Sequence, residues 1–453
     1  MQTHDLIVIG AGMAGINAVG RAAGDGRRIA LIERGMFGGT CPTRGCIPSK
    51  ALIRSAEIAH DARRAPEFGV RVGPVEVDFA AVMARVRDIV NRGSNGARAH
   101  IESLEGVEIV EGEATFADAT TVTVGARELS APTVLVTTGA APTVSPIPGL
   151  AGVPHWTSDD LLRATELPRR LVVIGAGPVA LELGQAMSRL GSSVTIVEVL
   201  PRLLPNAEPD LADMLRGYLV DEGIEILTGV EIIEARTGPS LAIRHDGAAR
   251  TLDADALLVA TGRGPAIEAL ALERAGVRAG PWGIEVDAHL QTAQPGVYAA
   301  GDVVGLPYGA FTHVARRMGV SVAENALGLN PHEVDPDVGP TAIFTDPEMS
   351  SIGLTEAAAR EAGHDIGVGL ARFGGGKARA WGEERGMVKV IVERSTRRLL
   401  GAHVLGYHGT DLIHPVAVAM NAPGGTVDPV LATMHIHPTL GETVLSAAQR
   451  AVA

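Results

Sequence analysis

The segment at residues 38–50 reads Gly-Gly-Thr-Cys-Pro-Thr-Arg-Gly-Cys-Ile-Pro-Ser-Lys and holds both cysteines of the chain, Cys41 and Cys46. In an ideal helix, residues five apart have Cα atoms roughly 8 to 9 Å apart, whereas a disulfide bridges at most about 7 Å. A bond between the two cysteines therefore requires a distorted backbone, which Gly45, Pro42 and Pro48 would permit. The alternative is two unpaired buried thiols; the motifs that surround the pair favour a redox-active disulfide.

A nucleotide-binding pattern precedes this segment. The apolar run 6–9 leads into a fingerprint with Gly10, Gly12 and Gly15 and then into an alanine-rich helix. The next apolar run ends in Glu33, about twenty residues on, where a carboxylate can accept hydrogen bonds from a ribose. The combination predicts a βαβ unit that binds a dinucleotide; the alternative is a glycine-rich turn.

A second fingerprint follows the apolar run 171–174. It contains Gly175 and Gly177, has Ala180 in place of the third glycine, and is followed by a strand that ends in Glu198. A carboxylate at that point favours a free 2′-hydroxyl and repels a 2′-phosphate, so NAD is preferred over NADP. Two such units imply two dinucleotides, and spacing alone does not say which is held and which is exchanged.

Composition limits the classes of function. The 453 residues are 46% hydrophobic, too many for one core, and the net charge of −13 argues against nucleic-acid binding. No apolar run approaches the roughly 18 to 20 residues of a membrane span, and the first strand begins too early to leave room for a signal peptide. We expect a cytosolic multidomain protein without membrane contact, in which a catalytic disulfide is more usual than a structural one.

The remaining segments predict helices, further strands and a closing pair of polar residues. Helices are expected at 50–64 and at 79–104, the second interrupted near 91–96, and from about residue 331 the pattern changes to that of an α+β domain. His437 stands five residues before Glu442, so the carboxylate could orient the imidazole and raise its basicity. The alternative is a surface histidine, and no chemistry is assigned to His435.

Taken together, these motifs resemble the flavin-dependent pyridine nucleotide–disulfide oxidoreductases, and within that family most closely the dihydrolipoamide dehydrogenases. The resemblance rests on segment 38–50, on Thr-Asp-Pro-Glu at 345–348, on Gly-Leu-Thr-Glu at 353–356 and on the segment His-Pro-Thr-Leu-Gly-Glu at 437–442. It implies a homodimer that oxidises dihydrolipoyl groups, on a lipoyl-bearing protein or a small dithiol, with FAD and NAD as cofactors.

The implied fold is α/β, with two Rossmann-like dinucleotide-binding domains and a C-terminal α+β dimerisation domain. The implied boundaries are an FAD-binding domain at 1–148 and 265–330, an NAD-binding domain at 149–264, and a dimerisation domain at 331–453. The resemblance places FAD on Gly10, Gly12, Gly15, Glu33, Thr40, Lys50, Ala114, Gly139, Asp302 and Thr312. It places NAD on Gly175, Gly177, Val179, Glu198, Val230 and Gly262.

The resemblance also implies roles in catalysis, and no metal ligands. The implied catalytic residues are Cys41, Cys46, His437, Glu442, Lys50 and Glu182. The first cysteine exchanges with the substrate dithiol, and the second lies against the flavin as a thiolate. The histidine and its glutamate serve the other subunit's first cysteine, and the lysine–glutamate pair lies between flavin and nicotinamide.

Two positions depart from the family pattern. Between the cysteines the family has Leu or Val and then Asn-Val, where this chain has Pro42-Thr43-Arg44, and Gly441 replaces a serine. Arg44 could favour a thiolate or recognise an acidic substrate, or it could simply face solvent or form a structural ion pair. The competing functions are an NAD(P)H-dependent reductase of another disulfide or of a metal ion, and a flavin redox sensor without turnover.

Overall fold

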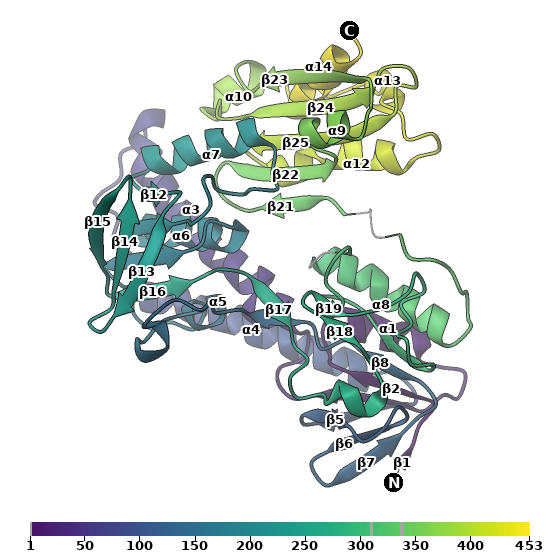
Figure 1. Ribbon diagram of the computed structural model, residues 1–453. Helices are drawn as coiled ribbons and strands as arrows, with labels where there is room; N and C mark the ends of the chain where they lie inside the picture. The colour runs from purple at the N-terminus through teal and green to yellow at the C-terminus, as the bar shows by residue number, and fades with distance from the viewer. Residues whose placement is uncertain (1, 309–310, 336–338) are drawn as a thin grey trace.

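The computed structural model describes residues 2–308, 311–335 and 339–453. Its elements form three lobes, which contain the N-terminal part, the middle part and the C-terminal part of the chain (Figure 1). The predicted α/β fold is confirmed, since two of the lobes are built on parallel sheets and the third on an antiparallel sheet.

The N-terminal lobe contains a five-stranded parallel sheet in the order β20-β8-β2-β3-β4. Every residue of β2 is buried, as expected for a strand covered on both faces, and Val8 of β2 is in register with Leu31 of β3. The strands are β2 (Leu6–Ile9), β3 (Ile29–Glu33), β4 (Val107–Glu111), β8 (Val134–Val136) and β20 (Val297–Ala299). Because β20 comes from beyond the middle lobe, the chain leaves this lobe and returns to it.

Helices α1 (Met13–Ala22) and α8 (Thr312–Ala326) pack against each other beside this sheet (Figure 1). The two backbones approach closely, because a Cβ atom at Gly319 would lie 2.2 Å from the carbonyl oxygen of Ala14. A small sheet in the order β1-β7-β6-β5 completes the lobe. Its strands are β1 (Gln2–Thr3), β5 (Ala114–Phe116), β6 (Thr121–Val124) and β7 (Arg127–Ser130).

The cysteine segment forms α2 (Thr40–Arg44) and the start of α3 (Cys46–Arg64), and both helices pack against α4 (Phe79–Glu102). The predicted interruption of α4 near 91–96 is wrong, because the helix is continuous. Its glycines cost about 1 kcal/mol each in helix propensity. Buried side chains at three- and four-residue spacing, including Val86, Val90 and Ser94, anchor one face of α4 and outweigh that cost.

The middle lobe repeats the same design with four parallel strands in the order β12-β11-β10-β16. Its parallel strands are β10 (Arg170–Ile174), β11 (Ser193–Val197), β12 (Glu225–Leu227) and β16 (Ala256–Val259), and its helices are α5 (Ser158–Leu161), α6 (Pro178–Leu190) and α7 (Pro209–Asp221). An antiparallel sheet of β13 (Glu231–Arg236), β14 (Ser240–His245) and β15 (Ala248–Asp253) is attached to it. Strands β9 (Ala140–Pro142) and β17 (Arg263–Pro265) pair where the chain enters and leaves the lobe. One further hairpin consists of β18 (Ala279–Gly280) and β19 (Gly283–Ile284).

The C-terminal lobe is an antiparallel sheet in the order β21-β22-β25-β24-β23 with helices around it. Its strands are β21 (Thr341–Ile343), β22 (Glu348–Gly353), β23 (Ile366–Arg372), β24 (Met387–Glu393) and β25 (Leu399–Gly406). Its helices are α9 (Glu356–Glu361), α10 (Gly376–Trp381), α11 (Gly409–Leu412), α12 (His414–Asn421), α13 (Asp428–Ala432) and α14 (Gly441–Ala451). Among the described helices, none is both long and apolar enough to cross a membrane.

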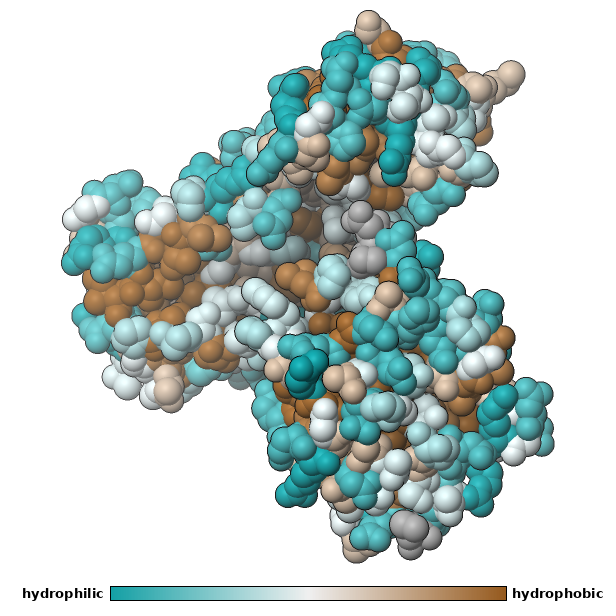
Figure 2. All heavy atoms as spheres, turned by 45° about the vertical axis from the view of Figure 1, so that its right-hand side comes forward, coloured by the Kyte–Doolittle hydropathy of each residue, from teal (hydrophilic) through white to brown (hydrophobic). Residues whose placement is uncertain are grey.

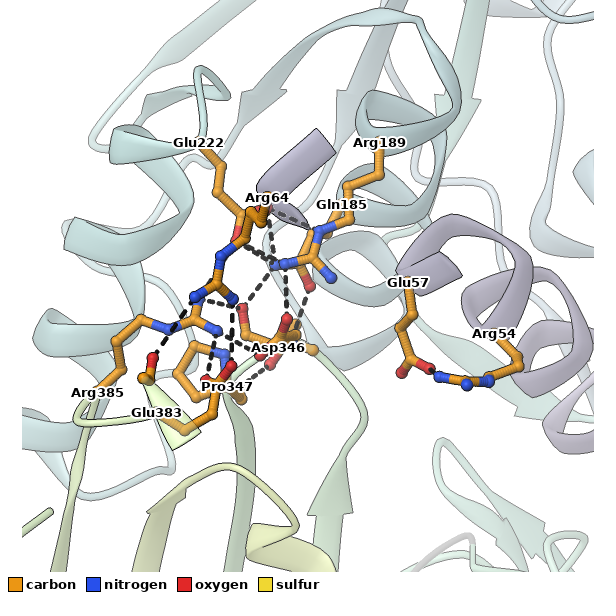
Figure 3. Close-up of polar contacts among 12 residues, drawn as sticks. Arg54, Glu57, Arg64, Gln185, Arg189, Glu222, Asp346, Pro347, Glu383 and Arg385 are labelled. Atoms are coloured by element: carbon orange, nitrogen blue, oxygen red, sulfur yellow. Dashed lines mark hydrogen bonds and ion pairs between the residues drawn. The ribbon is translucent and has the colours of Figure 1, made fainter. Parts of the chain in front are cut away.

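A partly buried ion-pair network joins the C-terminal lobe to the middle lobe (Figure 3). The Asp346 carboxylate lies 2.8 Å from Arg189 of α6 and 2.8 Å from Arg385 of the C-terminal lobe. Arg189 also contacts Glu222 at 2.7 Å. Burial alone would raise the pKa of Asp346, but the two arginines outweigh it and lower that pKa. Asp346 therefore stays ionised and fixes the C-terminal lobe against α6.

Candidate functional site

The redox segment brings the two cysteines together through a break between two helices. Helix α2 ends at Arg44, Gly45 has φ −136° and ψ −111°, and α3 begins at Cys46. A Cβ atom at Gly45 would lie 3.0 Å from the carbonyl oxygen of Thr40, so a side chain there would crowd the turn. The predicted distortion at Gly45 is confirmed.

The two thiols differ in acidity although they are neighbours. The two sulfurs are not joined by a disulfide, and both residues are half-buried, so the structure shows the dithiol. The disulfide stays a prediction. A hydrogen bond with Cys41 lowers the pKa of Cys46 to about 6, helped by the Thr312 hydroxyl and the charge of Lys50 against the opposing effect of burial. The same hydrogen bond between the two thiols, together with burial, raises the pKa of Cys41. Near neutral pH, Cys46 is thus the thiolate and Cys41 the thiol.

Thr312 contacts Cys46 from a distant part of the chain. It is the first residue of α8, and its Oγ1 lies 3.2 Å from the Cys46 Sγ. A hydroxyl that donates to a thiolate stabilises the charged form, and the positive end of the α8 dipole acts in the same direction. The resemblance implied only a contact between Thr312 and FAD, so this contact with sulfur was missed.

One cavity contains both cysteines and most of the residues predicted to hold FAD. Nine of the ten line it: Gly10, Gly12, Glu33, Thr40, Lys50, Ala114, Gly139, Asp302 and Thr312. Gly15 does not, and instead lets α1 pack tightly, because a Cβ atom there would lie 1.9 Å from the Gly10 carbonyl oxygen. The roles of these residues toward FAD stay predictions.

The cavity has the chemistry that a bound dinucleotide requires. Three buried polar atoms on its wall have no hydrogen-bond partner among the residues that the structure describes: Thr138 Oγ1, Arg44 Nε and Arg263 Nε. Burial raises the pKa of the Asp302 carboxyl, which also faces the cavity. Such groups are normally satisfied by a ligand or water, and they suit the hydroxyl, phosphate and carbonyl groups of FAD. The residues present therefore fit the implied cofactor.

Lys50 and Glu182 form the predicted pair at the side of the cavity next to the middle lobe. Lys50 Nζ lies 2.8 Å from Glu182 Oε2. The backbone N–H of Phe344 donates to the other carboxylate oxygen at 2.9 Å, and the Phe344 ring lies 4.0 Å from Lys50 Nζ. Phe344 was not predicted, and nothing in the sequence distinguishes it from an ordinary core residue.

Residues predicted to hold NAD are more scattered. Glu198 accepts hydrogen bonds from the backbone N–H groups of Ala176 at 2.8 Å and Leu200 at 2.9 Å. Val179 lines the cavity beside Glu182, whereas the side chain of Val230 is buried in the core of the middle lobe. Only the backbone of Val230 could therefore contact a nucleotide. The NAD-binding roles of these residues and of Gly175, Gly177 and Gly262 stay predictions.

His437 and Glu442 meet each other, but within one chain they do not meet the cysteines. Their Nδ1 and Oε1 atoms are 3.0 Å apart, and the backbone N–H of Thr439 donates to the other Glu442 oxygen at 2.9 Å. The bond with His437 and that from Thr439 lower the pKa of Glu442. The imidazole is 76% exposed and does not line the cysteine cavity. His435 instead places its Nε2 3.0 Å from the Val430 carbonyl oxygen.

Arg44 faces the middle lobe. Its Nε lies 3.6 Å from a carboxylate oxygen of Asp159, whose other oxygen lies 3.6 Å from Arg263. The cation that lowers the pKa of Cys46 is Lys50, so the suggestion that Arg44 acts on the thiolate has no support in this arrangement. No pattern in the sequence indicated Asp159, because its place in the site depends on a contact between distant segments.

Comparison with known proteins places this architecture in a family. Residues 4–325 match the model of pyridine nucleotide-disulphide oxidoreductases, and residues 339–448 match the dimerisation domain of the same proteins. The chain is 36% identical to a dihydrolipoyl dehydrogenase of Chlorobaculum tepidum, with 98% of this chain and 96% of the relative covered. It is 34% identical to a mercuric reductase of Staphylococcus aureus, with 98% and 82% covered.

Solved structures agree with these matches. The HOCl-induced flavoprotein disulfide reductase RclA of Escherichia coli has a TM-score of 0.88 and 29% identity, with 98% of this chain and 99% of that chain covered. A Cu(II) complex of the same reductase gives 0.88 and 30%, with 99% of each chain covered. The predicted fold and the cofactors FAD and NAD are thereby confirmed at the level of the family, and the dimerisation domain supports a homodimer. The chain belongs to the pyridine nucleotide-disulphide oxidoreductase family.

Proposed function

We propose that this protein oxidises dihydrolipoyl dithiols with NAD⁺, giving the cyclic disulfide, NADH and a proton. The full-length similarity to dihydrolipoyl dehydrogenases, including a 38% identical one from Thermus scotoductus, supports the proposal. The paired thiols of Cys41 and Cys46 are the groups that such an exchange requires.

The hydrogen-bonded pair of His437 and Glu442 is the observation that carries this proposal. A dithiol must lose a proton before its sulfur can attack a disulfide, whereas a metal ion has no proton to lose. The bond to Glu442 at His437 Nδ1 leaves Nε2 exposed as the proton acceptor. Dithiol oxidation therefore uses His437 as a base, whereas the reduction of a metal ion does not require one.

The homodimer supplies the geometry that one chain lacks. Exposed apolar side chains on the C-terminal lobe, including Val418, Met434 and Ile436, mark a surface suited to a partner. A recess separates the C-terminal lobe from the N-terminal lobe (Figure 2). In the proposed dimer, His437 of one protomer serves the cysteine pair of the other.

Each residue then has a defined task. His437 takes the proton from a substrate thiol, and the resulting thiolate attacks the sulfur of Cys41 in the oxidised pair. Cys46 leaves as a thiolate, which Thr312 and Lys50 stabilise, and the second substrate thiolate releases Cys41 as it closes the product disulfide. FAD, held by the residues that line the cavity, would supply the two-electron redox chemistry that links the reduced Cys41–Cys46 pair to NAD⁺.

A second candidate is the reverse use of the same site, in which NAD(P)H reduces another disulfide or a metal ion. The mercuric reductase among the relatives and the Cu(II) complex among the similar structures support it. A flavin sensor without turnover is less well supported, because the cysteine pair and the His437–Glu442 pair are both present.

Steady-state kinetics distinguish these functions. We expect the kcat/KM of NAD⁺ reduction with dihydrolipoamide to exceed the kcat/KM of NADH oxidation with lipoamide, glutathione disulfide, Cu²⁺ or Hg²⁺.

The variant His437→Gln should lose about 10²- to 10⁴-fold in dithiol oxidation. His435→Gln is the matched control and should stay within about twofold of wild type, since the hydrogen bond of His435 is to the Val430 carbonyl oxygen and not to Glu442. Normal turnover by His437→Gln would refute the assignment.

A further inference from the structure

The segment that joins β21 to β22 in the C-terminal lobe is bound by one face of α6 (Figure 3). The Gln185 side chain bonds to the backbone N–H and to the carbonyl oxygen of Asp346, both at 2.8 Å. Arg189 binds the Asp346 carboxylate, and Glu182 accepts the backbone N–H of Phe344. The three side chains of α6 are buried and recur at three- and four-residue spacing. They therefore fix the place of this segment against the helix.

Phe344 contacts both members of the Lys50–Glu182 pair. Its backbone N–H donates to Glu182 Oε1 at 2.9 Å, while Lys50 Nζ lies 2.8 Å from the other oxygen of that carboxylate. The centroid of the Phe344 ring is 4.0 Å from Lys50 Nζ, well within the roughly 6 Å of a cation–π contact. Lys50 and Glu182 line the cofactor cavity, whereas Phe344 does not. Phe344 therefore supports the pair from behind.

Lys50 needs a second contact if its charge is to stay in one place. The lysine side chain is flexible, and an ion pair with one carboxylate permits several positions of the ammonium group. The Lys50 side chain is also 32% exposed, so water competes for the ammonium group. The Phe344 ring attracts the ammonium group through its face and occupies the space beside it. The ring therefore restricts a charge that Glu182 alone would leave mobile.

The position of Lys50 matters to the cysteine pair. Lys50 follows Cys46 by four residues on α3, so the two side chains share one side of that helix, and both line the cofactor cavity. The charge of Lys50 lowers the pKa of Cys46, in addition to the hydrogen bonds with Cys41 and Thr312. Because the attraction between two charges weakens as their separation grows, an ammonium group that drifts into solvent would stabilise the thiolate less.

We propose that Phe344 is a positioning residue that holds the Lys50 ammonium group beside the cysteine pair, so that the C-terminal lobe sets the charge next to Cys46. Phe344 carries out no chemistry itself, because its ring and its N–H act through Lys50 and Glu182. The inference goes beyond the proposed function, since it concerns the reduced cysteine pair and holds for any substrate. It gives the C-terminal lobe a part in the redox site of its own chain.

The pH dependence of iodoacetamide alkylation at Cys46 in the reduced holoenzyme tests the proposal. Phe344→Leu removes the ring and should raise the pKa of Cys46 from about 6 by roughly half a unit. Phe344→Tyr keeps an aromatic face and should retain the wild-type profile. Phe373→Leu is the matched control, because it makes the same change in the buried core of the same lobe. It should lower the melting temperature without moving the pKa of Cys46.

A double-mutant cycle separates positioning from packing. The variant Lys50→Met lacks the charge, so adding Phe344→Leu to it should cause no further shift in the pKa of Cys46. If Phe344→Leu yields no folded holoenzyme, Phe344→Met also removes the ring and gives the same comparison. An unchanged pKa in Phe344→Leu, or an equal shift with and without the Lys50 charge, would overturn the inference. An equal shift in Phe373→Leu would overturn it as well.

Discussion

The two glycine fingerprints begin alike. Gly10 and Gly175 have φ of 105° and 104°, and a Cβ atom at either would lie 2.6 Å from a backbone carbonyl oxygen. In both units the acid that ends the second strand accepts a backbone N–H just after the first glycine, at 2.8 Å for Glu33 and 2.8 Å for Glu198. The repeated geometry indicates one βαβ design used twice.

Their surroundings differ. A Cβ atom at Gly39 of the redox segment would lie 2.5 Å from the Gly12 Cα, whereas one at Gly177 would meet no atom of the described residues within 4 Å. The first fingerprint is thus covered by the segment that carries the cysteines, and the second is open. We infer that enclosure retains FAD beside the dithiol and that openness lets NAD exchange, which is the assignment that spacing alone left undecided.

The largest effect is expected from adding one methyl group to the covered unit. Gly39→Ala forces a Cβ atom onto the Gly12 backbone at φ +68°, so the purified protein should lose most of its flavin, as measured by the ratio of absorbance at the flavin band to that at 280 nm. Gly177→Ala should retain it.

Because Gly39→Ala could also unfold the chain, Gly69→Ala provides a reference for strain alone. Gly69 has a similar φ of +76° with open space around it. If Gly39→Ala kept its flavin while Gly69→Ala and Gly177→Ala behaved as wild type, the first unit would not be enclosed in the way described.

A smaller effect is expected from replacing Glu198 or Glu33, and the two replacements should affect different cofactors. Glu198→Gln removes the charge that repels a 2′-phosphate, so the preference for NAD⁺ over NADP⁺ in kcat/KM should fall by about tenfold with flavin content unchanged. Glu33→Gln should weaken flavin retention and leave the nucleotide preference as it was. Identical phenotypes for both variants would contradict the division of roles.

The smallest effect is expected at Thr312, where α8 reaches the sulfur of the covered unit. Loss of the hydroxyl in Thr312→Val should raise the pKa of Cys46 from about 6 by on the order of one unit, so the thiolate should disappear at a higher pH than in wild type. The pH dependence of iodoacetamide alkylation at Cys46, followed by mass spectrometry, measures this. Thr312→Ser should restore the wild-type profile. If Thr312→Val left the pKa of Cys46 unchanged, the contact with the Thr312 hydroxyl would not stabilise the thiolate.

Local patterns in the sequence predicted the local parts of this arrangement. Both fingerprints, their terminal acids and the break at Gly45 depend on neighbouring residues, and the structure has them where the sequence places them. The five-residue spacing of His437 and Glu442 already suggested that these two meet, whereas the closeness of Lys50 to Glu182 was available only through the family resemblance.

Contacts between distant segments could not be predicted from the sequence. The Thr312 hydroxyl reaches a cysteine 266 positions away, and Arg44 meets Asp159 of another lobe. Helix α4 runs through glycines because packing on one face outweighs propensity. In each case tertiary packing, which no local pattern encodes, decided the outcome.

The central claim is that the dithiol of Cys41 and Cys46 exchanges electrons with a flavin held in the same cavity. Anaerobic reductive titration of the purified flavoprotein tests it most directly, with wild type compared with Cys46→Ser. The account predicts that wild type takes up about twice the electrons of Cys46→Ser, because the variant retains only the flavin as acceptor. Equal uptake by the two proteins, with equal flavin content, would contradict it.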